Sequence, residues 1–184
     1  GLALETKPGF FDLSGNIPQQ DPIIGSALTV LDLFGIDGGF NELSRWLRSP
    51  FFVDNHNQLS QRAVLESGLR LRMEVQLKFL DAFERGGLAE HLRSVDPELA
   101  SLLEGAVKLI NGVPNRSVPS DWVQIWERLL RQLCWQQQRF YPEGLALWES
   151  ALNEFVQLTP VLGEITAQVA IKEIFGGKFG DTKN

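Results

Sequence analysis

Apolar residues recur every three or four positions through most of the chain, and strict alternation of apolar and polar residues is nearly absent. This spacing places apolar side chains along one face of a helix. Clusters of Gly, Pro and polar residues separate the apolar stretches and predict short connections. The pattern predicts an all-α fold, an irregular multi-helix bundle of about eight helical segments with at most one short N-terminal strand.

Three regions differ in this pattern. Residues 1–20 hold Pro and Gly around the short apolar run Phe10-Phe11-Asp12-Leu13, which predicts an extended N-terminal segment with room for one strand. Residues 21–175 carry the helical spacing and form the predicted helical domain. Residues 176–184 are rich in Gly and Lys and are predicted to be a flexible tail.

Two helix starts are marked by the same local signal. In Asp21-Pro22 and in Asp96-Pro97, the Asp side chain can accept hydrogen bonds from free N–H groups, and Pro fits the first helical position. The first of these helices has apolar residues on all sides and ends at Gly35, so we predict that it is buried nearly all round.

The other predicted helices follow from stripes and stop signals. They are Phe40–Arg48, a long helix from Leu59 to Arg85 with a weak point at Gly68, Leu88–Arg93, a helix capped by Ser120 that runs to Leu133, Leu145–Val156, and a last helix from Thr159 to about Ile174. The helix that starts at Asp96-Pro97 has its apolar stripe from Leu99 to Ile110.

Composition narrows the function classes. The chain is 43% hydrophobic, which is enough for a core, and its net charge of −6 argues against a dedicated high-affinity nucleic-acid-binding protein. One Cys excludes an internal disulfide, and two His argue against a His-rich metal centre. Composition therefore argues against a disulfide framework and against a metal site built from several Cys or His side chains.

Several residues and motifs could in principle take part in catalysis or ligand binding, but for each of them we favour a purely structural role. Cys134 lies between Leu133 and Trp135 and is predicted to pack in the core rather than act with His56 or His91. The glycine-rich stretch 35–39 lacks the Lys of a phosphate-binding loop. The carboxylate pairs Glu149/Glu154 and Asp81/Glu84 are predicted to lie on solvated helix surfaces. The side chains of Trp122, Trp126 and Trp148 are predicted to be core residues rather than platforms for stacking nucleic-acid bases.

Basic residues are locally in excess between positions 45 and 93. This stretch holds eight Lys and Arg against six Asp and Glu, within a chain that is acidic as a whole. Two interpretations remain open: a weak phosphate-contacting face, or a mixed, solvated helix surface, which is the commoner outcome.

Three stretches, in order, resemble one protein family. The first is Phe11-Asp12-Leu13-Ser14-Gly15 with Asp21-Pro22-Ile23-Ile24-Gly25-Ser26-Ala27-Leu28, which resembles a segment of the second RecA-like domain in UvrD/RecB/AddB-type helicases. The second is Leu43-Ser44-Arg45-Trp46-Leu47-Arg48-Ser49-Pro50-Phe51-Phe52, which is similar to the Leu-Leu-Arg-Ser-Pro-Phe segment of bacterial AddB-like DNA repair proteins with a PD-(D/E)XK nuclease domain. The third, Trp122 through Phe155, resembles a Trp-containing helix pair of that family.

The resemblance implies a 2B-type helical insertion of the second motor domain. The motor motifs and nuclease carboxylates would lie elsewhere in a longer cytoplasmic protein, so we expect a non-catalytic scaffold. Its partners would be the remainder of the parent protein, a partner subunit and duplex DNA, with Arg45, Arg48, Arg62 and Arg70 as the contact residues. We expect no cofactor and no membrane contact.

Two other function classes stay open. A stand-alone helical protein-interaction module would expose an apolar patch of several hundred Å² and no basic face. An enzyme of unknown type would need a concave pocket with convergent polar groups.

Overall fold

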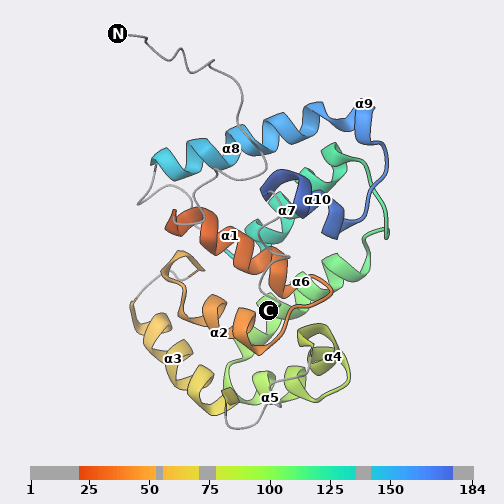
Figure 1. The fold of residues 1–184 in the computed structure, drawn as a ribbon. Helices are drawn as coiled ribbons and strands as arrows, with labels where there is room; N and C mark the ends of the chain where they lie inside the picture. Colours follow the sequence, from red (N-terminus) through yellow and green to blue (C-terminus); the bar gives the residue numbers. More distant parts are fainter. Residues whose placement is uncertain (1–20, 53–55, 71–77, 136–141, 176–184) are drawn as a thin grey trace, which may run out of the picture.

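The computed structural model describes residues 21–52, 56–70, 78–135 and 142–175, and within them the chain is all-α (Figure 1). The described helices are α1 Pro22–Leu33, α2 Phe40–Arg48, α3 His56–Arg70, α4 Phe79–Glu84, α5 Leu88–Val95, α6 Pro97–Asn111, α7 Pro119–Gln132, α8 Pro142–Gln157, α9 Thr159–Leu162 and α10 Ala167–Phe175, with the 3-10 turn η1 Pro50–Phe52 after α2. The predicted fold class is confirmed. The predicted strand, the extended segment 1–20 and the tail 176–184 lie outside the described residues.

Helix α1 lies at the centre of the molecule and packs against α2, α7 and α8 (Figure 1). Eight of its residues are buried, and the other four, Pro22, Gly25, Thr29 and Asp32, lie along one strip of the helix, so α1 is buried on all faces but this one, close to the prediction. Asp21 caps it by accepting a hydrogen bond from the Ile23 N–H at 3.0 Å, next to Pro22 at the first position. The local signal therefore fixes the start of the central helix.

Helices α2 and α3 pack against each other on one side of α1, and α4, α5 and α6 form the neighbouring part of the bundle (Figure 1). The start of α6 uses the second predicted cap, because Asp96 accepts a hydrogen bond from the Leu99 N–H at 3.0 Å. The α1–α2 loop is tied to this part by a hydrogen bond from the Phe79 N–H to the Gly38 carbonyl at 2.7 Å.

Aromatic side chains join α7 to α8. The Trp126 ring stacks between Trp122, at 6.4 Å between ring centroids, and Phe155, at 5.8 Å. Trp148 lies edge-on to Trp135 at 5.8 Å. All of these side chains are buried, which confirms that Trp122, Trp126 and Trp148 are core residues rather than stacking platforms.

The prediction of one helix from Leu59 to Arg85 is wrong. Gly68 lies inside α3 and does not interrupt it, whereas Lys78 has an extended backbone, with φ −66° and ψ 140°, immediately before α4. The interruption coincides with the hydrogen bond between Phe79 and Gly38, a contact between segments far apart in the sequence. Helical periodicity alone could not reveal it.

The predicted last helix is also two helices rather than one. Gly163 follows α9 with φ 59°, a left-handed conformation that favours glycine, and the chain then forms an antiparallel bridge between Ile165 and Ser117 before α10 begins. The Trp122 indole N–H donates to the Ile165 carbonyl at 2.9 Å. Pairing with a distant segment therefore overrides the helical spacing of Val161, Ile165 and Val169.

Two single-residue predictions at the ends of α7 are wrong. Val118, not Ser120, is the residue before the helix, and the Ser120 N–H donates to the Thr159 hydroxyl at 3.2 Å. Cys134 is exposed rather than packed in the core. Its φ of 60° turns the chain at the end of the helix, so that Leu133 and Trp135 are buried while Cys134 faces outward.

None of the helices among the described residues is long and apolar enough to cross a membrane.

Candidate functional site

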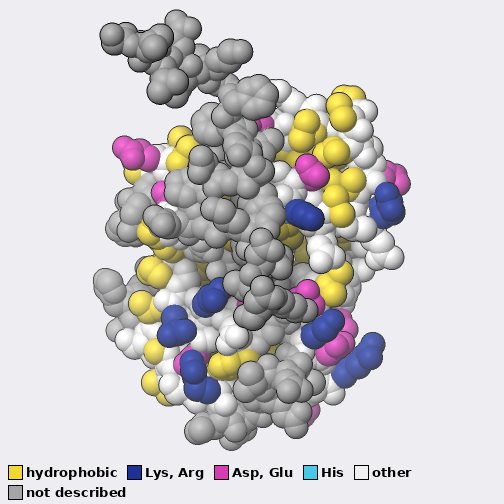
Figure 2. All heavy atoms as spheres, viewed as in Figure 1, with side chains coloured by type: hydrophobic (Ala, Val, Ile, Leu, Met, Phe, Trp, Pro, Cys, Tyr) yellow, Lys and Arg dark blue, Asp and Glu magenta, His cyan; other side chains and the backbone are white. Residues whose placement is uncertain are grey.

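A basic surface on α2 and α3 is formed by the exposed side chains of Arg45, Arg48 and Arg70. We call it the α2–α3 basic face. Figure 2 shows Lys and Arg side chains gathered over these two helices at the lower left of the view. Arg45 and Arg48 are three residues apart on α2, and Arg48 and Arg70 both lie close to the Ser44–Glu66 hydrogen bond. Three of the four arginines predicted as contact residues therefore lie on one surface.

The amphipathic pattern of α2 places its arginines outward. Phe40, Leu43, Trp46 and Leu47 are buried against the core, and Ser49-Pro50 ends the helix. The remaining positions 45 and 48 are three apart, so their side chains are neighbours on the outer face. At the start of the helix, the Gly39 N–H donates to the Glu42 carboxylate at 2.9 Å.

Arg62 lies away from this face, in the interior between the two helices. It is only 5% exposed, and its guanidinium carbon lies 5.0 Å from the centroid of the Trp46 ring. A planar guanidinium over an indole is a favourable cation–π arrangement. Arg62 therefore holds α3 against α2 rather than facing solvent, and we do not include it in the α2–α3 basic face.

A buried carboxylate, Glu66, lies beneath the α2–α3 basic face. Its oxygen Oε1 accepts a hydrogen bond from the Ser44 hydroxyl at 2.6 Å and one from Arg70 Nη2 at 2.5 Å. The Glu66 side chain is 7% exposed and that of Arg70 is 58% exposed. The hydrogen bonds from Ser44 and Arg70 hold the pKa of Glu66 below its ordinary value, and the nearby charge of Arg48 adds to this.

Arg70 is held from two sides. Besides its ion pair with Glu66, its guanidinium carbon lies 5.5 Å from the centroid of the Phe40 ring. Arg48 donates from Nε to the Ser44 carbonyl at 3.4 Å, at the edge of the same cluster. The cluster of Ser44, Glu66 and Arg70 thus connects α2 to α3 and sets the position of one of the three surface arginines.

A second acidic group lies near Arg45. Asp32, at the C-terminal end of α1, has a pKa raised to about 6, mainly because burial disfavours its charged form and also because Glu42 is nearby; Arg45 acts in the opposite direction. The group changes charge close to neutral pH, but it belongs to the packing between α1 and α2.

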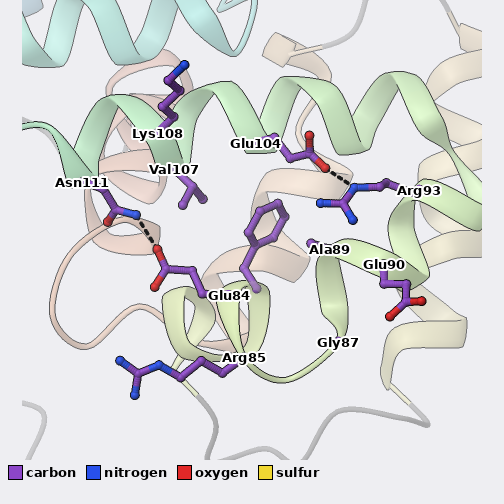
Figure 3. Close-up of a pocket in the computed structure, with 11 residues that line it drawn as sticks. Glu84, Arg85, Gly87, Ala89, Glu90, Arg93, Glu104, Val107, Lys108 and Asn111 are labelled. Atoms are coloured by element: carbon purple, nitrogen blue, oxygen red, sulfur yellow. Dashed lines mark hydrogen bonds and ion pairs between the residues drawn. The ribbon is translucent and has the colours of Figure 1, made fainter.

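An open groove of about 670 Å³ lies between α4, α5 and α6 (Figure 3). Four of its polar side chains form two pairs: Arg93 forms an ion pair with Glu104, and the Asn111 amide donates to the Glu84 carboxylate. Both pairs face the groove in Figure 3. Arg85, Glu90 and Lys108 also line the groove, but Figure 3 shows their side chains pointing in different directions. The groove therefore does not present a convergent set of functional groups to a substrate.

The predicted carboxylate pairs lie on solvated helix surfaces. Asp81, Glu84 and Glu149 are exposed and Glu154 is half-buried. Among the described residues, no group of three or more His, Cys, Asp or Glu side chains is arranged to hold a metal ion.

Comparison with known proteins adds no relative. No family model, no curated protein and no solved structure matches this chain.

Sequence reasoning missed the cluster around Glu66. One signal was present, because Glu66 and Arg70 are four residues apart on a predicted helix, a spacing that favours an ion pair. The contribution of Ser44, which lies 22 residues away from Glu66, depends on how α2 and α3 pack and has no local signal.

Proposed function

We propose that this chain is a non-catalytic helical domain of a larger DNA repair or recombination protein of the helicase–nuclease type. In this proposal the bundle serves as a scaffold and partner contact within the parent protein, and the α2–α3 basic face makes a weak contact with the phosphates of duplex DNA. The chemistry of the parent protein would be carried by other parts of it.

The observation that carries this proposal is the way the stretch Leu43–Phe52 is divided between core and surface. Its apolar residues Leu43, Trp46, Leu47, Phe51 and Phe52 are buried, while both of its arginines are exposed on one face. This is the stretch that resembles the AddB-like DNA repair proteins. A rigid helix with two neighbouring guanidinium groups suits contact with a phosphate backbone.

The predicted contact is weak, because the surface has few basic residues and the chain as a whole has a net charge of −6. Binding of this kind is driven by the release of counterions from DNA and falls steeply as salt concentration rises. The proposal therefore predicts sequence-independent binding that is strongest at low salt.

The test is binding of a fluorescent DNA duplex by the double variant Arg45→Ala/Arg48→Ala. We expect its affinity to fall roughly 10-fold or more near 50 mM salt, because two phosphate contacts are lost. The matched control, Arg85→Ala/Lys108→Ala, removes the same charge from the groove between α4 and α6, where both residues are exposed. Equal losses in the two variants, or no binding by the wild-type chain, would contradict the proposal.

A second candidate, a protein-interaction module unrelated to DNA, is favoured by one observation. Val161 in α9 and Val169 in α10 are 80% and 42% exposed, and Figure 2 shows apolar side chains over this part of the molecule at the upper right. If this apolar surface is the functional one, Val161→Asp/Val169→Asp would abolish association with the partner protein and leave the fold intact. The same variant would leave DNA binding unchanged if the first proposal holds.

A further inference from the structure

The three arginines of the α2–α3 basic face are not equivalent. Arg45 and Arg48 are exposed on α2, but Arg70 shares its charge with the carboxylate of Glu66, 2.5 Å away. The carboxylate is itself fixed by Ser44, so it cannot swing out into solvent without losing a buried hydrogen bond. A fixed negative charge therefore lies directly beneath the basic face.

We propose that Glu66 is a positioning residue that restrains Arg70 and weakens the α2–α3 basic face as a ligand for DNA phosphates. This inference rests on the proposed function. Two consequences follow from the geometry. Arg70 must leave Glu66, or share its hydrogen bonds, to contact a phosphate, and any phosphate near Arg48 or Arg70 meets the repulsion of the Glu66 carboxylate.

The decisive variant is Glu66→Gln. The Gln amide has the size of the carboxylate, and its oxygen can still accept a hydrogen bond from the Ser44 hydroxyl. The packing of α2 against α3 is therefore retained while the negative charge is removed. We expect duplex DNA to bind roughly 3- to 10-fold more tightly near 50 mM salt. The slope of log affinity against log salt should steepen by about 1, as for one added phosphate contact.

A double-mutant cycle with Arg70→Ala identifies the residue through which Glu66 acts. In the wild-type background, Arg70→Ala should lower the affinity by less than about 2-fold, because the charge of Arg70 is already compensated. In the Glu66→Gln background, the same change should remove most of the gain. A merely structural role of Glu66 would not produce this coupling.

Two controls separate the inference from simpler effects. Glu104→Gln makes the same charge change and releases Arg93 at the groove between α5 and α6, and it should raise the affinity less than 2-fold. Ser44→Ala removes the hydrogen bond to Glu66 but keeps its charge, and it should give no gain. A gain in Glu104→Gln equal to that in Glu66→Gln would overturn the inference.

The outcomes distinguish this inference from the proposed function. If Arg45→Ala/Arg48→Ala weakens binding but Glu66→Gln gives no gain, the inference is overturned and the proposed function stands. If neither the wild-type chain nor any variant binds DNA, both are overturned. If Glu66→Gln unfolds, the DNA affinities of Arg70→Ala and Arg48→Ala, each made in the wild-type background, provide the test. A loss of affinity in Arg70→Ala as large as that in Arg48→Ala would overturn the inference.

Discussion

At the scale of single residues, polar side chains form hydrogen bonds or close contacts that connect neighbouring helices. Asp21 is the clearest case, because its carboxylate caps α1 and also lies against Gly144 of α8. The same holds for Glu66, whose hydrogen-bond partners come from α2 and α3. Replacements at such contacts change the position of an element as well as the local interaction.

Gly144→Ala should destabilise the protein by about 1–2 kcal/mol, comparable to the loss of a helix cap. A Cβ atom at this position would lie 2.4 Å from Asp21 Oδ1, so the capping carboxylate must move. Urea unfolding measures the effect. Gly68→Ala is the matched control: a Cβ there meets nothing within 4 Å inside α3, and it should stabilise the protein by about 0.5–1 kcal/mol. Equal effects of the two changes would refute this interpretation.

Asp32→Asn should stabilise the protein at pH 7.5 but not at pH 3.5. Because the pKa of Asp32 rises from 3.8 to about 6 on folding, the folded state holds its proton more tightly, and stability contributed by this group falls as pH rises from about 4 to 6. Partial exposure reduces the expected gain to about 1–2 kcal/mol. Urea unfolding of the variant across this pH range tests the sign, with Asp37→Asn in the exposed turn as the control. A gain that is independent of pH would count against the assignment.

At the scale of elements, local signals identified the starts of α1 and α6 but not that of α7, and distant contacts accompany the breaks before α4 and after α9. Asp21-Pro22 and Asp96-Pro97 were interpreted correctly because capping depends on neighbours in sequence. The breaks at Lys78 and Gly163 were missed because they accompany contacts to Gly38 and Ser117, which lie in other parts of the chain. The candidate site follows the same division: the outward direction of Arg45 and Arg48 follows from the stripe of α2, whereas the burial of Arg62 follows from its contact with Trp46.

Trp126→Ala should cost about 3–5 kcal/mol in the free energy of unfolding. Its ring stacks on Trp122 of the same helix and Phe155 of α8, so the change leaves a cavity at the junction of α7 and α8. Gln124→Ala, on the exposed side of α7, should change the free energy by less than about 0.5 kcal/mol. Urea unfolding followed by circular dichroism compares the two. A cost below about 1 kcal/mol for Trp126→Ala would show that this junction does not hold the bundle together.

At the scale of the whole molecule, one contiguous hydrophobic core connects the described helices, and charge is distributed unevenly over its surface. Acidic and basic side chains are mixed at the groove between α4, α5 and α6, where Arg93 pairs with Glu104, whereas arginines dominate the α2–α3 basic face. The net charge of −6 gave no sign of this local surplus, because a sum over the chain carries no spatial information. The proposed role depends on this uneven distribution.

The most direct test is a nuclear magnetic resonance titration of the ¹⁵N-labelled chain with a short DNA duplex at low salt. Binding through the α2–α3 basic face predicts that amide shifts change mainly in Leu43–Ser49 and near Arg70, and that added salt reverses them. Shifts that cluster around the groove between α4 and α6 or around Val161 and Val169, or no shifts at all, would contradict the proposed DNA contact.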